Sequence, residues 1–129
     1  MAEAEPYPAR PLVVVVDDDP SIRRALARLL RSASLEVEAF GSAGELLACN
    51  GSLQPACLVV DVHLPDMNGI SLLRELVAAE PARPVVMITG DRDPELRLRA
   101  LQAGAAAVLI KPFDEGQLLD EVRRALSSR

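Results

Sequence analysis

Residues 13–20 read VVVVDDDP, and they give the clearest indication of the fold class. A short, continuous run of β-branched residues is typical of a strand that is buried on both faces of a parallel sheet. Asp19 and Pro20 then have the residue types preferred at the N-cap and the first position of a helix. The stretch therefore predicts a buried strand that passes through an acidic turn into a helix, as in an α/β domain.

Three more apolar runs have the same form, and each is followed by a polar residue. They are residues 58–60 before Asp61, residues 85–88 before Thr89, and residues 108–110 before Lys111. Helical patterns lie between these runs, and residues 35–40 form one more predicted strand. Alternation of strand and helix five times over predicts an α/β fold, with a doubly wound five-stranded parallel sheet and helices on both faces.

The bulk composition limits the domain organisation and the partners. The chain of 129 residues fits one domain, which we expect over residues 12–127, after a flexible lead-in over residues 1–11. The net charge of −5 argues against nucleic-acid binding by this domain, because nucleic-acid-binding proteins usually present a basic face. No apolar run approaches the roughly 18 residues of a membrane span, and the N-terminal residues do not have a signal-peptide pattern. We therefore expect a cytoplasmic protein that does not contact a membrane.

The polar residues that follow the strands are expected to meet at one edge of the sheet. In a parallel sheet all carboxyl ends lie on the same edge, and ligands bind there at the point where the strand order reverses. With the strand order 2-1-3-4-5, the first and third strands flank this point. Asp17 and Asp18 would then face Asp61, with Thr89 and Lys111 on the same edge.

These residue types suit magnesium and phosphate chemistry. Clustered carboxylates repel one another unless a cation lies between them, and Mg²⁺ prefers oxygen ligands of this kind. A carboxylate beside Mg²⁺ can act as a nucleophile and form an aspartyl phosphate. A hydroxyl from Thr89 and the ammonium of Lys111, which is the only lysine in the sequence, would suit the oxygens of a phosphoryl group. The residues therefore predict phosphoryl transfer to an aspartate.

The order and spacing of these residues resemble the receiver domain of bacterial two-component response regulators. The matching residues are VDD at 16–18, DVHLP at 61–65 with Gly69, ITG at 88–90 and KPF at 111–113. The resemblance extends over roughly residues 12–126 and implies the flavodoxin-like (βα)5 topology with the strand order 2-1-3-4-5. Residues 18–23 and 87–90 most resemble the receivers of nitrogen-fixation-type transcriptional regulators. Because those relatives usually continue into a helix-turn-helix domain, this chain either acts alone or is part of a longer regulator.

The resemblance assigns roles to the acidic residues. Asp61 would be the phosphoacceptor, which takes a phosphoryl group from a sensor histidine kinase or a phosphotransfer protein. Asp18, Asp61 and the backbone carbonyl of His63 would bind Mg²⁺ directly, with Asp17 acting through water. The phosphorylated domain would change its surface and so signal to an output partner or to an output domain.

The resemblance also assigns roles at the ends of the fourth and fifth strands. Thr89 and Lys111 would hold phosphoryl oxygens, and Gly90 would leave room for them. The Lys111-Pro112 peptide bond is typically cis in such domains. A receiver is a phosphoacceptor signalling domain rather than an enzyme, although it may catalyse its own phosphorylation and dephosphorylation.

Val108 departs from the family pattern. Three residues before the lysine, receivers usually carry Tyr, Phe or His, and this ring swings inward as the threonine moves toward the phosphate. Val108 has no ring, which leaves open a second hypothesis, a receiver-like interaction module that works without phosphorylation. A third hypothesis is an aspartyl-phosphate phosphatase of the dehalogenase type. In that class, however, the nucleophile follows the first strand and the acidic pair comes last, which reverses the order seen here.

Overall fold

The computed structural model describes residues 10–49 and 51–127. The flexible lead-in expected over residues 1–11 therefore lies outside the described residues, except for Arg10 and Pro11. Within the described ranges, five strands alternate with five helices from Leu12 to Ser127. This alternation confirms the element order predicted from the sequence.

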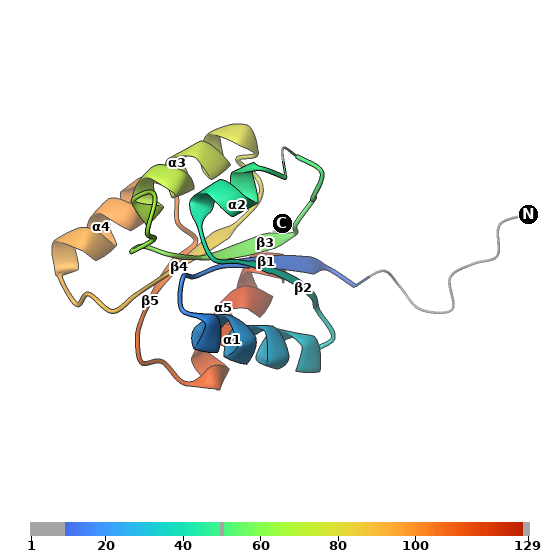
Figure 1. Ribbon diagram of the computed structural model, residues 1–129. Helices are drawn as coiled ribbons and strands as arrows, with labels where there is room; N and C mark the ends of the chain where they lie inside the picture. The colour runs from blue at the N-terminus through green and yellow to red at the C-terminus, as the bar shows by residue number, and fades with distance from the viewer. Residues whose placement is uncertain (1–9, 50, 128–129) are drawn as a thin grey trace, which may run out of the picture.

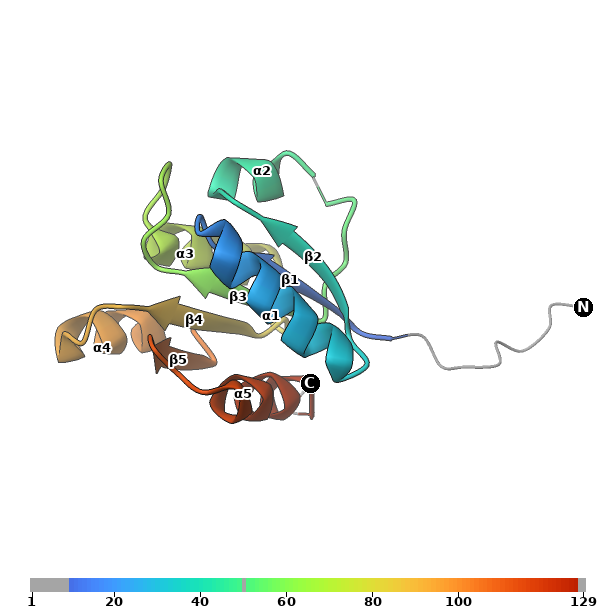
Figure 2. The ribbon, with the colours of Figure 1, turned by 60° about the horizontal axis from the view of Figure 1, so that its bottom comes forward.

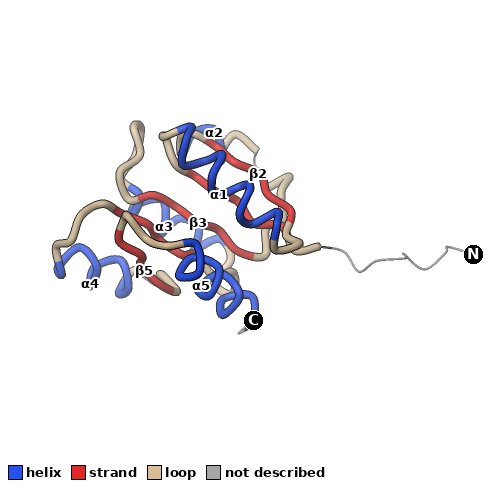
Figure 3. Tube along the Cα trace, turned by 90° about the horizontal axis from the view of Figure 1, so that it is seen from below, coloured by secondary structure: helices blue, strands red, loops and turns tan. Residues whose placement is uncertain are grey.

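The strands form one parallel sheet. They are β1 (Leu12–Val16), β2 (Glu36–Phe40), β3 (Cys57–Asp61), β4 (Val85–Thr89) and β5 (Ala107–Ile110). The order across the sheet is β2-β1-β3-β4-β5, and each neighbouring pair is parallel (Figure 1). In Figure 3 the strands, drawn in red, lie side by side from β2 to β5. The predicted fold class and strand order are both confirmed.

Helices cover both faces of the sheet. They are α1 (Pro20–Ser32), α2 (Ala43–Leu47), α3 (Gly69–Ala79), α4 (Pro94–Gln102) and α5 (Glu115–Ser127). Helices α2, α3 and α4 lie on one face, and Figure 2 brings forward the opposite face, which α1 and α5 cover. Within residues 10–49 and 51–127, every helix is too short or too polar to span a lipid bilayer.

The sheet separates two aliphatic cores, which explains why the apolar runs of the sequence are continuous. Val13 and Val15 pack with residues of α1 and α5, whereas Val14 and Val16 pack with residues of α2, α3 and α4. All four valines are 0% exposed. Because successive side chains of a strand point to opposite faces, a strand between two cores needs an apolar residue at every position.

The helix starts follow from local sequence. Asp19 accepts a hydrogen bond from the Ser21 amide at 2.8 Å, with Pro20 at the first helical position of α1. Asp93 and Pro94 open α4 in the same way. These caps satisfy amides that have no partner inside the helix. They also make the turns after β1 and β4 short, which keeps the polar residues of those turns close to the sheet edge.

Candidate functional site

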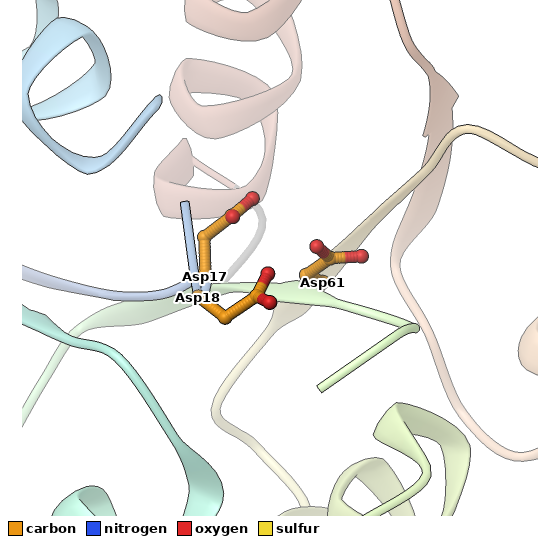
Figure 4. A group of neighbouring side chains, drawn as sticks. All are labelled: Asp17, Asp18 and Asp61. Atoms are coloured by element: carbon orange, nitrogen blue, oxygen red, sulfur yellow. The ribbon is translucent and has the colours of Figure 1, made fainter. Parts of the chain in front are cut away.

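Three aspartates meet where the strand order reverses. Strand β1 pairs with β2 on one side and with β3 on the other. Asp17 and Asp18 directly follow β1, and Asp61 is the last residue of β3. Each offers one carboxylate oxygen, and these oxygens lie within 4.8 Å of one another (Figure 4). The structure thus brings together the acids that the sequence placed at two strand ends.

Two of the three acids are buried. Asp17 is 0% exposed and Asp61 is 4% exposed, whereas Asp18 is exposed. Asp17 Oδ1 accepts a hydrogen bond from the Asp19 amide at 2.9 Å, and Asp61 Oδ1 accepts one from the His63 amide at 3.0 Å. These bonds orient both buried carboxylates and direct their Oδ2 atoms to the same space.

The Lys111 ammonium lies in that space. Its Nζ donates to Asp17 Oδ2 at 2.9 Å and to Asp61 Oδ2 at 3.1 Å. The lysine follows β5, two strands away from β3, so its flexible stem is needed to reach both acids. The only lysine of the chain is therefore the cation that joins the two buried carboxylates.

Burial and the charges of neighbouring groups shift the pKa values of Asp17 and Lys111. Burial raises the pKa of the Asp17 carboxyl, and the Asp61 charge adds to the rise, against the lowering effects of the Asp19 amide and Lys111. Burial alone lowers the pKa of the Lys111 ammonium, but the hydrogen bonds and charges of Asp17 and Asp61 outweigh it, and the pKa is raised. Lys111 therefore stays charged at neutral pH, while the acids remain under mutual repulsion.

Thr89 completes the edge. It is the last residue of β4 and is 1% exposed. Its Oγ1 accepts a hydrogen bond from the Asp91 amide at 3.0 Å, and its carbonyl accepts one from the Lys111 amide at 2.7 Å. The pairing of β4 with β5 thus sets Lys111 beside Thr89, on the edge that also carries Asp61.

Three more predictions concern residues next to these side chains. The Lys111-Pro112 peptide bond is cis, as the resemblance implies. An added Cβ at Gly90 would meet no heavy atom within 4 Å, so the space beside Thr89 is open. The His63 side chain is exposed, and the role of its carbonyl as a metal ligand stays a prediction.

Val108 is a core residue. It is 7% exposed, pairs with Met87 of β4, and belongs to the core that α2, α3 and α4 cover. Its side chain fills space beneath those helices, where an aromatic ring would need a larger volume.

Three further residues lie close to the site, and two of them, Arg23 and Asp66, had no clear signal in the sequence. Arg23 of α1 donates from Nη1 to the Asp17 carbonyl at 2.7 Å. Asp66, in the loop after β3, accepts hydrogen bonds from amides at the start of α2. Gly69 opens α3 so close to β3 that a Cβ there would collide with the Asp61 carbonyl and the Val62 backbone. Only Gly69 could have been found from sequence, because it is part of the matched family motif.

The residues fit a divalent cation. Three carboxylates lie close together and two of them contact one ammonium, which leaves an excess of negative charge in a partly buried site. Hard cations prefer oxygen ligands, and carboxylates on a semi-rigid sheet edge suit an ion that keeps some of its own waters. The cluster of Asp17, Asp18 and Asp61 could therefore bind a metal ion.

Comparisons with known proteins point to one family. The sequence profile of the response regulator receiver domain matches residues 13–123. Nodulation protein W of Bradyrhizobium diazoefficiens is 44% identical over 111 residues, which are 86% of this chain and 49% of that protein. The transcriptional regulatory protein FixJ of Azorhizobium caulinodans is 40% identical over 114 residues, which are 88% of this chain and 54% of that protein. The chain thus spans about half the length of these two relatives.

A solved structure agrees with this match. The CheY-like response regulator receiver domain protein from Methanospirillum hungatei superposes with a TM-score of 0.88 at 31% identity, covering 93% of this chain and 96% of that chain. The relatives thus include a nodulation protein and a transcriptional regulatory protein. Because the profile matches most of the chain and the fold agrees over nearly all of it, the chain belongs to the family of response regulator receiver domains of two-component systems.

Proposed function

We propose that this receiver domain, residues 12–127, takes up a phosphoryl group on Asp61 from a histidine kinase or a phosphotransfer protein in the cytoplasm. The observation that carries the proposal is the contact of the Lys111 ammonium with both Asp17 and Asp61, at 2.9 and 3.1 Å. It sets a cation and a second acid beside the carboxylate that matches the phosphoacceptor position of the family. Phosphorylation would then change the surface that an output partner or output domain contacts.

The proposed step is a transfer from nitrogen to oxygen. A carboxylate oxygen of Asp61 attacks the phosphorus of the donor's phosphohistidine, so that a P–O bond forms and the P–N bond breaks. The electron pair of the broken bond goes to the imidazole nitrogen of the donor, which then takes up a proton from solvent. The product is an aspartyl phosphate, which is a covalent intermediate that water can later hydrolyse.

Two side chains would hold the transferred group. Thr89 Oγ1 accepts the hydrogen bond of the Asp91 amide, which leaves the hydroxyl proton for a phosphoryl oxygen. The Lys111 ammonium would pair with another phosphoryl oxygen, because its stem already carries it to Asp61. These same groups support self-catalysed phosphorylation from small phosphodonors and self-catalysed hydrolysis, which we include in the proposal.

Mg²⁺ is the cation that we propose for the acidic cluster. Asp18, Asp61 and the backbone carbonyl of His63 would hold it directly, and Asp17 would act through water. When bound, it would offset the charge that a phosphoryl group adds beside three carboxylates.

Phosphorylation by a small-molecule phosphodonor tests the proposal. Wild-type protein is incubated with acetyl phosphate, with and without Mg²⁺, and its intact mass is measured. We expect the mass of one phosphoryl group to appear only with Mg²⁺. Asp61→Asn should gain none, and Asp120→Asn, which removes an exposed acid of α5, should behave as wild type.

The alternatives predict different results in this experiment and in an assay of phosphate release from organic esters. A wild type that gains no phosphoryl group would contradict the proposal and favour an interaction module that works without phosphorylation. This alternative rests on Val108, which stands where the family resemblance implies an aromatic residue. Steady release of inorganic phosphate from many organic esters would instead indicate a phosphatase.

A further inference from the structure

Asp66 joins the loop that follows Asp61 to the start of α2. It lies between β3 and α3, and its two carboxylate oxygens accept hydrogen bonds from the amides of Ala43 at 3.1 Å and Gly44 at 2.8 Å. These partners lie 23 and 22 positions away, so the contact links two separate loops. An added Cβ at Gly44 would lie 3.0 Å from Asp66 Oδ2, so glycine leaves room for this approach.

The contact completes the hydrogen bonding of the first turn of α2. Ser42 Oγ accepts from the Glu45 amide, and Glu45 Oε1 accepts from the Gly41 amide, both at 3.1 Å. These two bonds leave the amides of Ala43 and Gly44, the first two residues of α2, and Asp66 accepts from both. Because α2 has only five residues, its position depends on such tertiary contacts.

The same contact holds the tip of the loop after β3. The base of this loop is closed by the hydrogen bond from the Gly69 amide to the Val62 carbonyl at 2.7 Å, and by a bridge between His63 and Asn68. In the sequence Asp66 lies between His63 and Asn68, so it belongs to the part of the loop beyond this bridge. Its bonds to α2 therefore restrain the loop that contains the His63 carbonyl.

The start of α2 is in turn connected to Asp17. The Asp17 amide donates to the Phe40 carbonyl at 3.0 Å, directly before the turn into α2. Arg23 Nη1 donates to the Asp17 carbonyl at 2.7 Å and lies against Gly41, where an added Cβ would be 2.9 Å from it. Through the start of α2, Asp66 thus links the loop that follows Asp61 to the backbone of Asp17. Asp17 and Asp61 both belong to the acidic cluster.

We infer that Asp66 is a positioning residue for the cation site: by tying the loop after β3 to α2, it holds Asp61 and the His63 carbonyl in place opposite Asp17 and Asp18. This inference rests on the proposed function, because it takes Mg²⁺ as the ion. Residues that hydrogen-bond to metal ligands contribute about 10- to 100-fold to metal affinity. Asp66 restrains the loop without contacting a ligand, so its removal should lower the Mg²⁺ affinity about tenfold, at the low end of this range.

Calorimetric titration of Mg²⁺ into four proteins tests the inference. They are wild type, Asp66→Ala, Ser42→Ala and Glu45→Gln. Ser42→Ala weakens the same helix start but leaves the loop tied, and Glu45→Gln removes one negative charge while keeping the acceptor for Gly41. We expect Asp66→Ala to weaken Mg²⁺ binding about tenfold and both controls to stay close to wild type.

A conservative variant and the Mg²⁺ dependence of the phosphorylation rate provide two independent measurements. Asp66→Asn keeps one acceptor oxygen, so its Mg²⁺ affinity should fall between those of wild type and Asp66→Ala, and it serves if the alanine variant does not fold. In phosphorylation by acetyl phosphate, Asp66→Ala should need more Mg²⁺ but reach the wild-type rate at saturation.

The outcomes separate the two proposals. Equal Mg²⁺ affinity in wild type and Asp66→Ala would overturn the inference alone. An equal loss of Mg²⁺ affinity in Glu45→Gln would also overturn it, because the loss of one negative charge would then explain the effect. An equal loss in Ser42→Ala would overturn it as well, because Asp66 would then act only as a cap of α2. A wild type that binds no Mg²⁺ at all would instead contradict the proposed function, and the inference with it.

Discussion

The Lys111 ammonium lies 2.9 Å from Asp17 Oδ2, although 94 positions separate the two residues in the chain. The same nitrogen lies 3.1 Å from Asp61 Oδ2. The lysine thus lies between the two buried acids. It stabilises a cluster that would otherwise repel itself, and it competes with any cation that binds there.

Lys111→Met should therefore have two opposite effects. Without the Lys111 ammonium the buried Asp17 and Asp61 carboxylates lose their cationic partner, so the folded protein should be less stable by about 1–3 kcal/mol in the absence of Mg²⁺. Mg²⁺ should bind more tightly than to wild type, because the competing ammonium is gone. Urea unfolding with and without Mg²⁺, together with calorimetry, measures both effects. Unchanged stability in Mg²⁺-free buffer would show that the lysine does not hold the acids.

Asp17 makes a pH-dependent contribution to stability. Burial raises its pKa above 3.8 in the folded protein, so the folded chain holds this proton more tightly than the unfolded chain. Its stabilising contribution is complete below pH 3.8 and is lost as the pH rises through the raised pKa. Lys111, whose pKa is raised above 10.5, stays charged throughout this window.

The free energy of unfolding of Asp17→Asn should therefore increase relative to wild type as the pH rises from 3.8, and then level off. Urea unfolding across this pH range without Mg²⁺ measures the difference, with Asp120→Asn as the control for losing one carboxyl group. A difference that shrinks with rising pH would contradict the raised pKa.

Val108→Tyr should lower stability, even though aromatic residues are usual at this position in the family. Val108 is 7% exposed in the core beneath α2, α3 and α4, and a larger side chain in a packed core typically costs about 1–3 kcal/mol. Val108→Ile is the matched control with a smaller change of volume. If Val108→Tyr unfolds at the wild-type urea concentration, the ring has room there and Val108 is not a packing requirement.

Gly69→Ala should disturb Asp61 through the backbone. A Cβ at Gly69 would collide with the Asp61 carbonyl and with Val62, so the start of α3 must shift, at a cost of about 1–3 kcal/mol. Gly90→Ala is the matched control for stability, because a Cβ at Gly90 meets no atom within 4 Å. Equal midpoints of urea unfolding for the two variants would contradict this close approach.

The fold could be predicted because its determinants are local. Continuous runs such as residues 13–16 and 85–88 need two cores, and the caps at Asp19 and Asp93 mark where helices begin. The gathering of Asp17, Asp61, Thr89 and Lys111 then followed from the shared edge of a parallel sheet. The strand order came from the family resemblance, because the runs themselves do not state which strands are neighbours.

The side-chain contacts could not be predicted in the same way. An aspartate after Pro65 reads as an ordinary turn residue, and nothing local indicates that Asp66 accepts from amides more than twenty positions earlier. Arg23 likewise follows a helical pattern that suits an exposed face, yet its guanidinium bonds to the Asp17 carbonyl. The Asp66 contact depends on how two loops meet in space, and the Arg23 contact depends on how α1 lies against the turn before it. The periodicity of the sequence carries no information about either.

The identity of the phosphorylated residue tests directly whether Asp61 is the phosphoacceptor. Borohydride reduces an aspartyl phosphate to homoserine, so protein treated with acetyl phosphate and Mg²⁺ is reduced, digested and sequenced by mass spectrometry. We expect homoserine at position 61, and none without Mg²⁺. Homoserine at Asp17, Asp18 or another acid, or none in any sample, would contradict the claim that these residues form one site around a reactive Asp61.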